Sequence, residues 1–355
     1  MPDYLDPAVP TITRLMRQGG YVTGHFGKWH LGKDGSAPVP GAYGIDDHYT
    51  VNSSGPGWDE KQPFFRAKST DLIVDETIRF IEDHRDQPFY VQAWLLLTHA
   101  TLNPTEEQMK PYERSGPRGV PHKGASTIYY ASATAADAAI GRLMAKLDEL
   151  GLSDNTVVIF SSDNGPEDMH IRNASHSGIG STGPFRGRKR SLYEGGVRLP
   201  WIARWPGHIP AGVVNEESVM GGVDLLPTLC SLAGIDLPEG LKIDGEDMSR
   251  ALCGEAQKRS KPLMWEWRFG VAGHVINKSP ILSIRDGQWK LLMNPDRSRV
   301  ELYDIPNDPS ELNNLADRHP EIVGRLSKQV LGWQKTLPAG PMDADAGSNA
   351  YRWMW

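Results

Sequence analysis

The feature that most constrains the fold is an alternation of helical periodicity with near-continuous apolar runs. Ile12, Leu15 and Met16 share one helical face, and the run YVTGHFG follows them as a strand. Further helical patterns precede PFYVQAWLLLTHA (88–100) and NTVVIFSSDNG (155–165). Strands this apolar are typical of parallel sheets that helices cover, so each should be buried on both faces. We therefore predict an α/β fold with a mainly parallel central sheet and helices on both faces.

The pattern changes after about residue 260, where short strands replace the alternation. The run ILSIRDGQWKLLM contains an Asp-Gly pair, which is typical of a two-residue hairpin turn. The stretch that starts PSELNNLADRHP and runs over 309–337 has a helical pattern. We predict three parts: a main domain over 1–260, a smaller α+β subdomain with an antiparallel sheet and a helix over 261–337, and a poorly ordered tail over 338–355.

The bulk composition excludes several classes of partner. The 355 residues carry a formal net charge of −6 and no basic footprint for nucleic acid. No apolar run reaches about eighteen residues, so no membrane span is predicted. Cys230 and Cys253 are too few for a disulfide framework or a thiolate metal cluster. The first residues, MPDYLDPAVP, lack the basic and apolar regions of a signal peptide, so the sequence as given predicts a cytoplasmic location.

Polar side chains follow three of the predicted strands at their carboxyl ends, where ligands bind in open α/β sheets. Lys28 and His30 follow the first strand, His99 ends the second, and Asp163 and Asn164 end the third. A carboxylate beside an amide oxygen offers hard ligands that suit Ca²⁺ or Mg²⁺. Two ligands are too few for a calcium site, and a turn that caps the following helix is the alternative.

A glycine-rich cationic loop, GPFRGRKRSLYEGGVR, follows at 183–198 and contributes three arginines and Lys189. Its glycine and proline breaks fit an anion site better than a helix face, although a solvated loop would explain the same residues. Together with the cationic groups after the first two strands, Lys189 describes a pocket for a tetrahedral dianion such as sulfate or phosphate, beside a divalent cation.

Two common motifs are excluded. The run GKWHLGKD is one residue short of a phosphate-binding loop, and Asp34 stands where that loop has a hydroxyl. Trp29 and Leu31 also crowd the positions where such a loop needs small residues. The sequence has no G-x-S-x-G, which excludes a serine hydrolase of the α/β-hydrolase kind.

Several segments resemble the sulfatase family, in the order in which the family has them. GYVTGHFGKWHLG resembles the second sulfatase signature, TVVIFSSDNGPE the metal strand, and GRKRSLYEGGVRLPWIARWPG the segment with the active-site lysine. Further similar segments are LLLTHATL, VDLLPTLCSLAGIDLP, KIDGEDMSRAL and ELYDIPNDPSELNNLA. The chain is therefore identified as a member of the type I sulfatases of the alkaline phosphatase superfamily, similar to bacterial arylsulfatases and N-acetylgalactosamine-6-sulfatases.

The resemblance implies roles in sulfate-ester hydrolysis. Lys28 would stabilise the oxygen of the nucleophile, and His30 would be the base that later releases sulfate from the enzyme. Lys189 and His99 would bind the sulfate and neutralise or protonate the leaving alcohol. The implied ligands of Ca²⁺, which holds and polarises the sulfate oxygens, are Asp163 and Asn164.

The expected substrate is a sulfated carbohydrate or an aryl sulfate. The segment NASHSGIGSTGPFRGRKRSLYEGG is similar to that of bacterial sulfatases commonly assigned to sulfated sugars. Exposure to solvent on a loop is the alternative explanation for its polar residues. The candidates for contacting the sugar are His170, Arg172, His176 and Arg186.

The nucleophile motif of the family does not occur in the sequence. Type I sulfatases attack with formylglycine, which is made from the first residue of C-x-P-x-R or S-x-P-x-R. Neither motif is present, and SGPRG at Ser115 places its arginine one position too early. The family's first strand, with the aspartates that complete the calcium site, is not found either. We therefore expect an N-terminally truncated sulfatase that is inactive alone, periplasmic or extracellular if a missing N-terminus carried a signal.

Two other functions stay open at this point. A phosphatase or phosphonate hydrolase of the same superfamily would need additional His and Asp ligands for a zinc pair, and the runs GKWH and DNGP fit sulfatases better. A non-catalytic remnant that binds an anion or a sugar is favoured by the absent nucleophile.

Overall fold

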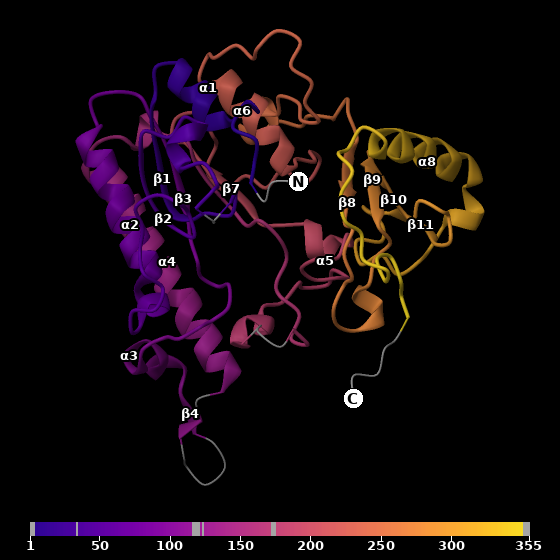
Figure 1. Cartoon of the computed structure of the whole chain (residues 1–355), viewed down its shortest axis with the longest axis horizontal. Coiled ribbons are helices and arrows are strands. Elements are labelled where there is room, and N and C mark those ends of the chain that lie inside the picture. The colour runs from indigo at the N-terminus through magenta and orange to yellow at the C-terminus, as the bar shows by residue number, and fades with distance from the viewer. Residues whose placement is uncertain (1–3, 33–34, 116–120, 123, 172–174, 351–355) are drawn as a thin grey trace. The chain divides into compact units, whose positions relative to one another are not determined.

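Figure 1 shows the computed structural model of the chain, which describes residues 4–32, 35–115, 121–122, 124–171 and 175–350. These residues form two compact units, each with its own hydrophobic core. The first unit comprises Met1–Val158, Arg204–Val214 and Gly222–Glu255. The second unit comprises Ile159–Ala203, Asn215–Gly221 and Ala256–Trp355.

The first unit is built around a three-stranded parallel sheet. Its helices and strands are α1 (Ile12–Gln18), β1 (Val22–Lys28), β2 (Asp47–Val51), α2 (Phe65–Asp83), β3 (Phe89–Trp94), α3 (Glu106–Met109), β4 (Arg114–Ser115), β5 (Pro121–His122), α4 (Ala125–Glu149), α6 (Leu225–Leu232) and α7 (Ser249–Leu252). The strand order is β2-β1-β3, so β1 is the central strand of this sheet.

Helices cover both faces of this sheet, as predicted. On one face α2 packs against β1, where the ring centroids of Phe80 and Phe26 lie 5.7 Å apart, and α4 packs on α2 (Figure 1). Side chains alternate along a strand, so Tyr90, which aligns with Thr23, points to the opposite face. The thiol of Cys230, in α6, lies close enough to Tyr90 to act on its charge. The α/β prediction is therefore confirmed for this unit.

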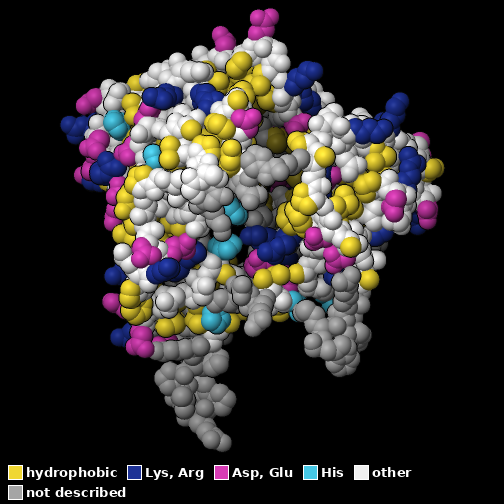
Figure 2. Space-filling view, viewed as in Figure 1, with side chains coloured by type: hydrophobic (Ala, Val, Ile, Leu, Met, Phe, Trp, Pro, Cys, Tyr) yellow, Lys and Arg dark blue, Asp and Glu magenta, His cyan; other side chains and the backbone are white. Residues whose placement is uncertain are grey.

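The outer surfaces of α2 and α4 carry interleaved acidic and basic side chains (Figure 2). Arg142 of α4 bonds to Asp71 and Asp75 of α2, and Lys146 pairs with Glu82. This mixed-charge surface matches the small formal net charge of the chain. Within the described residues no helix is long and apolar enough to cross a membrane.

The apolar strand β3 is less buried than its sequence predicts. All its residues are partly exposed, and the exposed fraction of Trp94 reaches 39%. Over the part of the chain that the structure describes, β3 has a strand neighbour on one edge only, which is β1. The prediction that this run is buried on both faces is therefore wrong, because β3 is an edge strand. An open edge is also what the expected absence of the family's first strand predicts.

The second unit is built around a four-stranded antiparallel sheet, with the order β11-β10-β9-β8. Its helices and strands are β6 (Val158–Ser161), α5 (Glu194–Val197), β7 (Trp201–Arg204), β8 (Leu263–Glu266), β9 (Leu282–Asp286), β10 (Trp289–Met293), β11 (Val300–Asp304) and α8 (Pro320–Gln334). The predicted hairpin is the β9–β10 pair. Leu326 and Val330 of α8 pack on the buried face of this sheet, and β6 and β7 form a separate two-stranded sheet.

The boundaries of this unit differ from those we predict. Residues 159–203 group with the C-terminal sheet and not with the rest of the predicted main domain at 1–260. Part of the predicted tail is held in place, because the carbonyl oxygen of Gly347 accepts hydrogen bonds from Asn294 and Arg299. Residues 351–355 of that tail lie outside the described residues.

The C-terminal helix is shorter than its sequence pattern. It begins at Pro320 and not at residue 309, because the preceding segment forms a different local structure. The carboxylate of Asp308 accepts the backbone N–H groups of Leu312 and Asn313, and Glu311 has a positive φ of 54°. Such carboxylate-to-backbone bonds compete with the hydrogen bonds of a helix.

Candidate active site

Lys28, His30 and His99 lie at one edge of the sheet in the first unit. Lys28 is the last residue of β1, His30 follows it on an exposed stretch, and His99 lies in an exposed turn after β3. Since β1 and β3 are adjacent and parallel, both carboxyl ends meet at the same edge. The structure therefore brings these three predicted residues to the edge where α/β sheets bind ligands.

The turn after β1 is fixed by a close backbone approach and a buried side chain. Gly27 has a φ of +111°, and a Cβ atom there would lie 2.1 Å from the carbonyl oxygen of Trp94. Trp29 is 1% exposed, and its backbone N–H donates to the carbonyl oxygen of Val51 at 2.9 Å. The buried indole anchors the segment between the two predicted catalytic residues that flank it.

Gly27→Ala is expected to destabilise the first unit by roughly 1–3 kcal/mol, the range for a strained backbone position. The new methyl group would meet the Trp94 carbonyl, and alanine disfavours the positive φ. Gly41→Ala is the matched control, because the described residues leave its Cβ position open. Urea unfolding measures the difference, and equal stability of the two variants would contradict the close approach.

Asp163, Asn164 and Lys189 lie close together in the second unit. The two strand-end residues follow β6, and Gly165 comes next. The backbone N–H of Lys189 donates to the carbonyl oxygen of Pro166 at 3.0 Å. The cationic loop therefore returns to the end of the strand that carries the predicted metal ligands.

The predicted calcium ligands do not form a complete metal site. The carboxylate of Asp163 is exposed, and the amide nitrogen of Asn164 donates to the carbonyl oxygen of Gly165 at 2.9 Å. Among the described residues, His, Cys, Asp and Glu side chains form no group of three or more that would hold a metal ion. Ca²⁺ takes about six to eight oxygen ligands, so these two residues supply only part of such a site.

The arginines beside Lys189 hold the loop in shape. The guanidinium of Arg188 donates to the carbonyl oxygens of Glu167, Gly178 and Gly180. Arg190 bonds to both carboxylate oxygens of Glu167, at 2.5 and 3.1 Å. Burial alone would raise the pKa of Glu167, but the Arg190 guanidinium holds that pKa below its usual value. Both arginines therefore serve the structure of the loop.

Asp168 is a candidate functional residue that the sequence analysis missed. Its carboxylate is 4% exposed and accepts hydrogen bonds from the backbone N–H of His170 at 2.8 Å and from Nδ1 of the same imidazole at 2.7 Å. The imidazole itself is half exposed. Asp168 thus orients His170 so that its Nε2 is the ring nitrogen available to a ligand. The spacing D-x-H was the only sequence signal for this pair.

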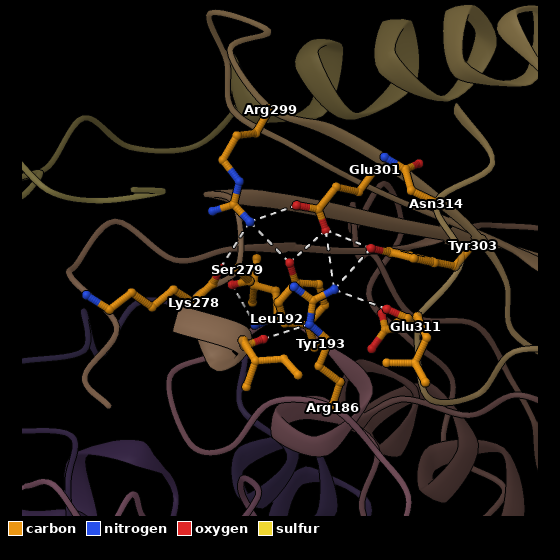
Figure 3. A network of polar contacts seen from close by, with 12 residues as sticks. Arg186, Leu192, Tyr193, Lys278, Ser279, Arg299, Glu301, Tyr303, Glu311 and Asn314 are labelled. Atoms are coloured by element: carbon orange, nitrogen blue, oxygen red, sulfur yellow. Dashed lines mark hydrogen bonds and ion pairs between the residues drawn. The ribbon is translucent and has the colours of Figure 1, made fainter. Parts of the chain in front are cut away.

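The other predicted sugar-contacting residues have different surroundings. Arg186 donates to the carbonyl oxygens of Ile276 and Glu311 and to the hydroxyl of Tyr303, and its guanidinium lies 3.8 Å from the ring centroid of Tyr193 (Figure 3). His176 is partly buried in a short 3₁₀-helix, and Arg172 lies outside the described residues. A sugar-contacting role for these three residues stays a prediction.

A hydrogen-bonded network joins the cationic loop to the C-terminal sheet (Figure 3). The carboxylate of Glu301 accepts the hydroxyls of Tyr193 and Tyr303 at 2.6 and 2.9 Å and the guanidinium of Arg299 at 2.7 Å. Burial, followed by the charge of Glu301, raises the pKa of Tyr193, so its phenol stays a donor. The loop that carries Lys189 is thus tied to β11.

Comparison with known proteins assigns the family. Residues 2–235 match the family model described as sulfatase. The chain belongs to the sulfatase family. Residues 183–336 match a second model, the C-terminal part of N-sulphoglucosamine sulphohydrolase. This second match spans both the cationic loop and the C-terminal sheet, which the structure places in one unit of this sulfatase.

Relatives and solved structures resemble nearly the whole chain. N-acetylgalactosamine-6-O-sulfatase of Bacteroides thetaiotaomicron is 26% identical over 91% of this chain and 76% of its own length. Human arylsulfatase A is 28% identical over 90% of this chain and 70% of its own length. A structure from glycosaminoglycan metabolism in B. thetaiotaomicron covers 94% of this chain and 83% of its own, with a TM-score of 0.75 and 22% identity. This last likeness shows the shared fold.

A buried ion cluster holds α5 of this sulfatase against the antiparallel sheet. Nζ of Lys290, a fully buried residue, lies 2.8 Å from Oε1 of Glu194 and 2.9 Å from Oε1 of Glu311. The backbone N–H of Glu194 donates to Oε2 of Glu311. Burial raises the pKa of Glu311 to about 6. Burial would also raise the pKa of Glu194, but Lys290 and Arg285 together hold it below the usual value.

Stability is expected to fall as the pH rises from about 4.5 to about 6 because of Glu311. Its pKa of about 6 lies above the usual 4.5, so the folded state holds this proton more tightly than the unfolded state. That contribution, roughly 2 kcal/mol, is complete below the lower pKa and lost as the pH rises through the higher one. Glu194 acts in the opposite direction, since its lowered pKa gives stability that is lost only at more acidic pH.

Urea unfolding at a series of pH values measures this slope. In Glu311→Gln, which keeps an acceptor for the backbone N–H of Glu194, the fall in stability across this window should disappear. A slope unchanged in that variant would assign the effect to other groups.

Proposed function

We propose that this chain derives from a sulfuric ester hydrolase that acts on a sulfated carbohydrate or an aryl sulfate. The observation that carries the proposal is the gathering of Lys28, His30 and His99 at the carboxyl edge of one sheet in a member of the sulfatase family. The names of its relatives, N-acetylgalactosamine-6-O-sulfatase and arylsulfatase A, support both substrate classes.

The cationic and imidazole groups suit the charges of this reaction. Lys28 and Lys189 would stabilise the negative charge that develops on the transferring sulfate and on the nucleophile. Nδ1 of His99 lies 2.8 Å from the carbonyl oxygen of Ala100, and because a carbonyl only accepts, Nδ1 carries a proton. The other ring nitrogen is then the one that can give a proton to the leaving alcohol, and His30 would act as the base that releases sulfate.

A divalent cation belongs to this proposal with two of its ligands only. Asp163 and Asn164 would supply hard oxygen ligands for Ca²⁺, and when bound the ion would neutralise charge on the sulfate oxygens. The sugar-side contacts are proposed to include His170, which Asp168 orients.

The chain as it stands is proposed to release no sulfate. Neither C-x-P-x-R nor S-x-P-x-R occurs in its 355 residues, so it offers no precursor of the formylglycine that the family uses. The cations that would face the reaction are present, but an attacking atom is not identified.

The test compares two chains with an aryl sulfate and a sulfated N-acetylgalactosamine in the presence of Ca²⁺. One is the 355-residue chain, and the other carries in addition a strand ending in two aspartates and a C-x-P-x-R segment matured to formylglycine. We expect sulfate release from the extended chain alone. Equal release from the shorter chain would contradict the mechanism, and binding of the sulfated sugar without turnover by either chain would favour the non-catalytic alternative.

A further inference from the structure

His25 is a fully buried imidazole between the two strands that carry the first half of the candidate site. Its exposed fraction is 0%, and the edges of its ring face the indoles of Trp29 and Trp94, with centroids 5.2 and 4.7 Å away. Nδ1 lies 3.0 Å from the side-chain amide of Gln92 on β3, and Nε2 lies 3.1 Å from the carbonyl oxygen of Lys28. Both ring nitrogens are therefore committed to specific partners.

The partners determine which ring nitrogen carries the proton. A carbonyl oxygen only accepts, so the bond to Lys28 requires a proton on Nε2. A neutral imidazole then has a bare Nδ1, which needs a donor. A half-turn of the Gln92 amide supplies that donor and turns the amide oxygen toward the hydroxyl of Tyr90, 3.0 Å from the other end of the amide. Every group in this string, from Tyr90 to the carbonyl of Lys28, is then satisfied.

The surroundings favour the neutral ring. Burial lowers the pKa of His25, and His48, which faces it across the β1–β2 pair, lowers it further. Burial also raises the pKa of Tyr90 to about 12, so its hydroxyl stays a donor. The alternative, with the amide oxygen toward Nδ1, requires an imidazolium whose contacts are an amide, a carbonyl and two indoles.

The bond from His25 completes the restraint of a single peptide group. In the peptide that joins Lys28 to Trp29, the N–H donates to Val51 on β2 at 2.9 Å, and the C=O accepts from His25. Strand pairing therefore holds one side of this peptide, and a side chain holds the other side just past Gly27, where the positive φ turns the backbone out of the regular strand. Lys28 and His30 flank the restrained segment.

We propose that His25, as the neutral Nε2–H tautomer held by Gln92 and Tyr90, is the positioning residue for the turn that carries Lys28 and His30. The restraint stands on the geometry alone, whereas its catalytic consequence rests on the proposed sulfatase function. His25 acts through the backbone carbonyl of Lys28 and does not touch a substrate.

The first test is the tautomer, read by NMR of the full chain labelled with ¹⁵N-histidine. The nitrogen shifts separate a protonated ring nitrogen from a bare one, and the signal missing in His25→Gln identifies this residue. We expect a protonated Nε2 and a bare Nδ1 throughout the range of about pH 5 to 8, in which an unperturbed histidine would titrate. A protonated Nδ1, or a ring that titrates normally, would overturn the proposal.

The second test separates positioning from packing. Backbone hydrogen exchange at Trp29 should speed up between about twofold and tenfold in His25→Leu, the effect of one lost hydrogen bond. His25→Gln keeps an N–H that reaches the carbonyl of Lys28 and should restore most of the protection. His48→Leu, on the neighbouring strand, is the control and should leave Trp29 unchanged. Equal exchange in the leucine variant and the parent chain, or no rescue by glutamine, would contradict the role of the bond.

If His25→Leu does not fold, His25→Gln and the tautomer decide the outcome. The catalytic consequence is measured separately, in the extended chain of the preceding section. There kcat should fall about tenfold in His25→Leu with KM little changed, and recover in His25→Gln. No activity in any extended chain would count against the proposed function only, whereas full activity of His25→Leu together with unchanged exchange would count against the positioning role.

Discussion

Lys290→Met is expected to lower the free energy of unfolding by roughly 3–5 kcal/mol, the range for removing one partner from a buried ion pair. Lys290 is fully buried, and its ammonium contacts the carboxylates of Glu194 and Glu311, which are 3% and 0% exposed. Methionine has a similar shape and fills the same space, so the loss would come from charge and not from a cavity. Two carboxylates would then share a dry site, with Arg285, 3.4 Å from Glu194, as the nearest remaining cation.

Two further variants separate this explanation from general damage to the core. Lys290→Met combined with Glu311→Gln removes one of the uncompensated charges and should recover part of the loss, which a double-mutant cycle measures as a coupling energy. Lys278→Met changes an exposed lysine of the same unit and should stay within about 0.5 kcal/mol of the parent chain. Additive losses for the double variant would show that the three residues do not act as a unit.

This cluster also shows where sequence reasoning stops. In QWKLLM, Lys290 occupies a polar position of a predicted strand and gives no sign of being buried. Its two partners come from distant parts of the sequence, and only the packing of α5 on the antiparallel sheet brings them together. The same holds for His25, whose sequence neighbours predict a strand but not the amide of Gln92 across the sheet.

Features set by local pattern were predictable. The helix at Ile12, the strand after it and the hairpin at Asp286 follow from periodicity and turn residues, and the structure has all three. The short strand β2 was missed because DHYTV carries no alternation long enough to stand out. The rule that ligands bind at carboxyl ends of parallel strands also placed Lys28 and His99 at one edge, since that rule depends on topology and not on side-chain contacts.

Lys189→Ala in the extended, formylglycine-bearing chain is expected to lower kcat/KM by roughly a hundredfold to a thousandfold. This is the range for removing one group that stabilises charge developing in the transition state. The loop geometry supports the choice of residue: Arg188 and Arg190 on either side are bonded to carbonyls and to Glu167. The backbone of Lys189 is held by Pro166 beside the strand end that carries Asp163, so the loop should keep its course in the variant.

The kinetic constants distinguish two ways in which Lys189 would act. If its ammonium only held the sulfate in the ground state, KM would rise while kcat stayed constant, because the charge would be bound equally before and during the reaction. If it neutralises charge that appears on bond cleavage, kcat should fall by most of the total effect, and more steeply for a substrate with a poor leaving group than for an activated aryl sulfate. Lys278→Ala provides the matched loss of an exposed lysine and should keep both constants. A variant at Lys189 with parent-like kcat on the poor substrate would remove this residue from the reaction and leave the loop with a structural role.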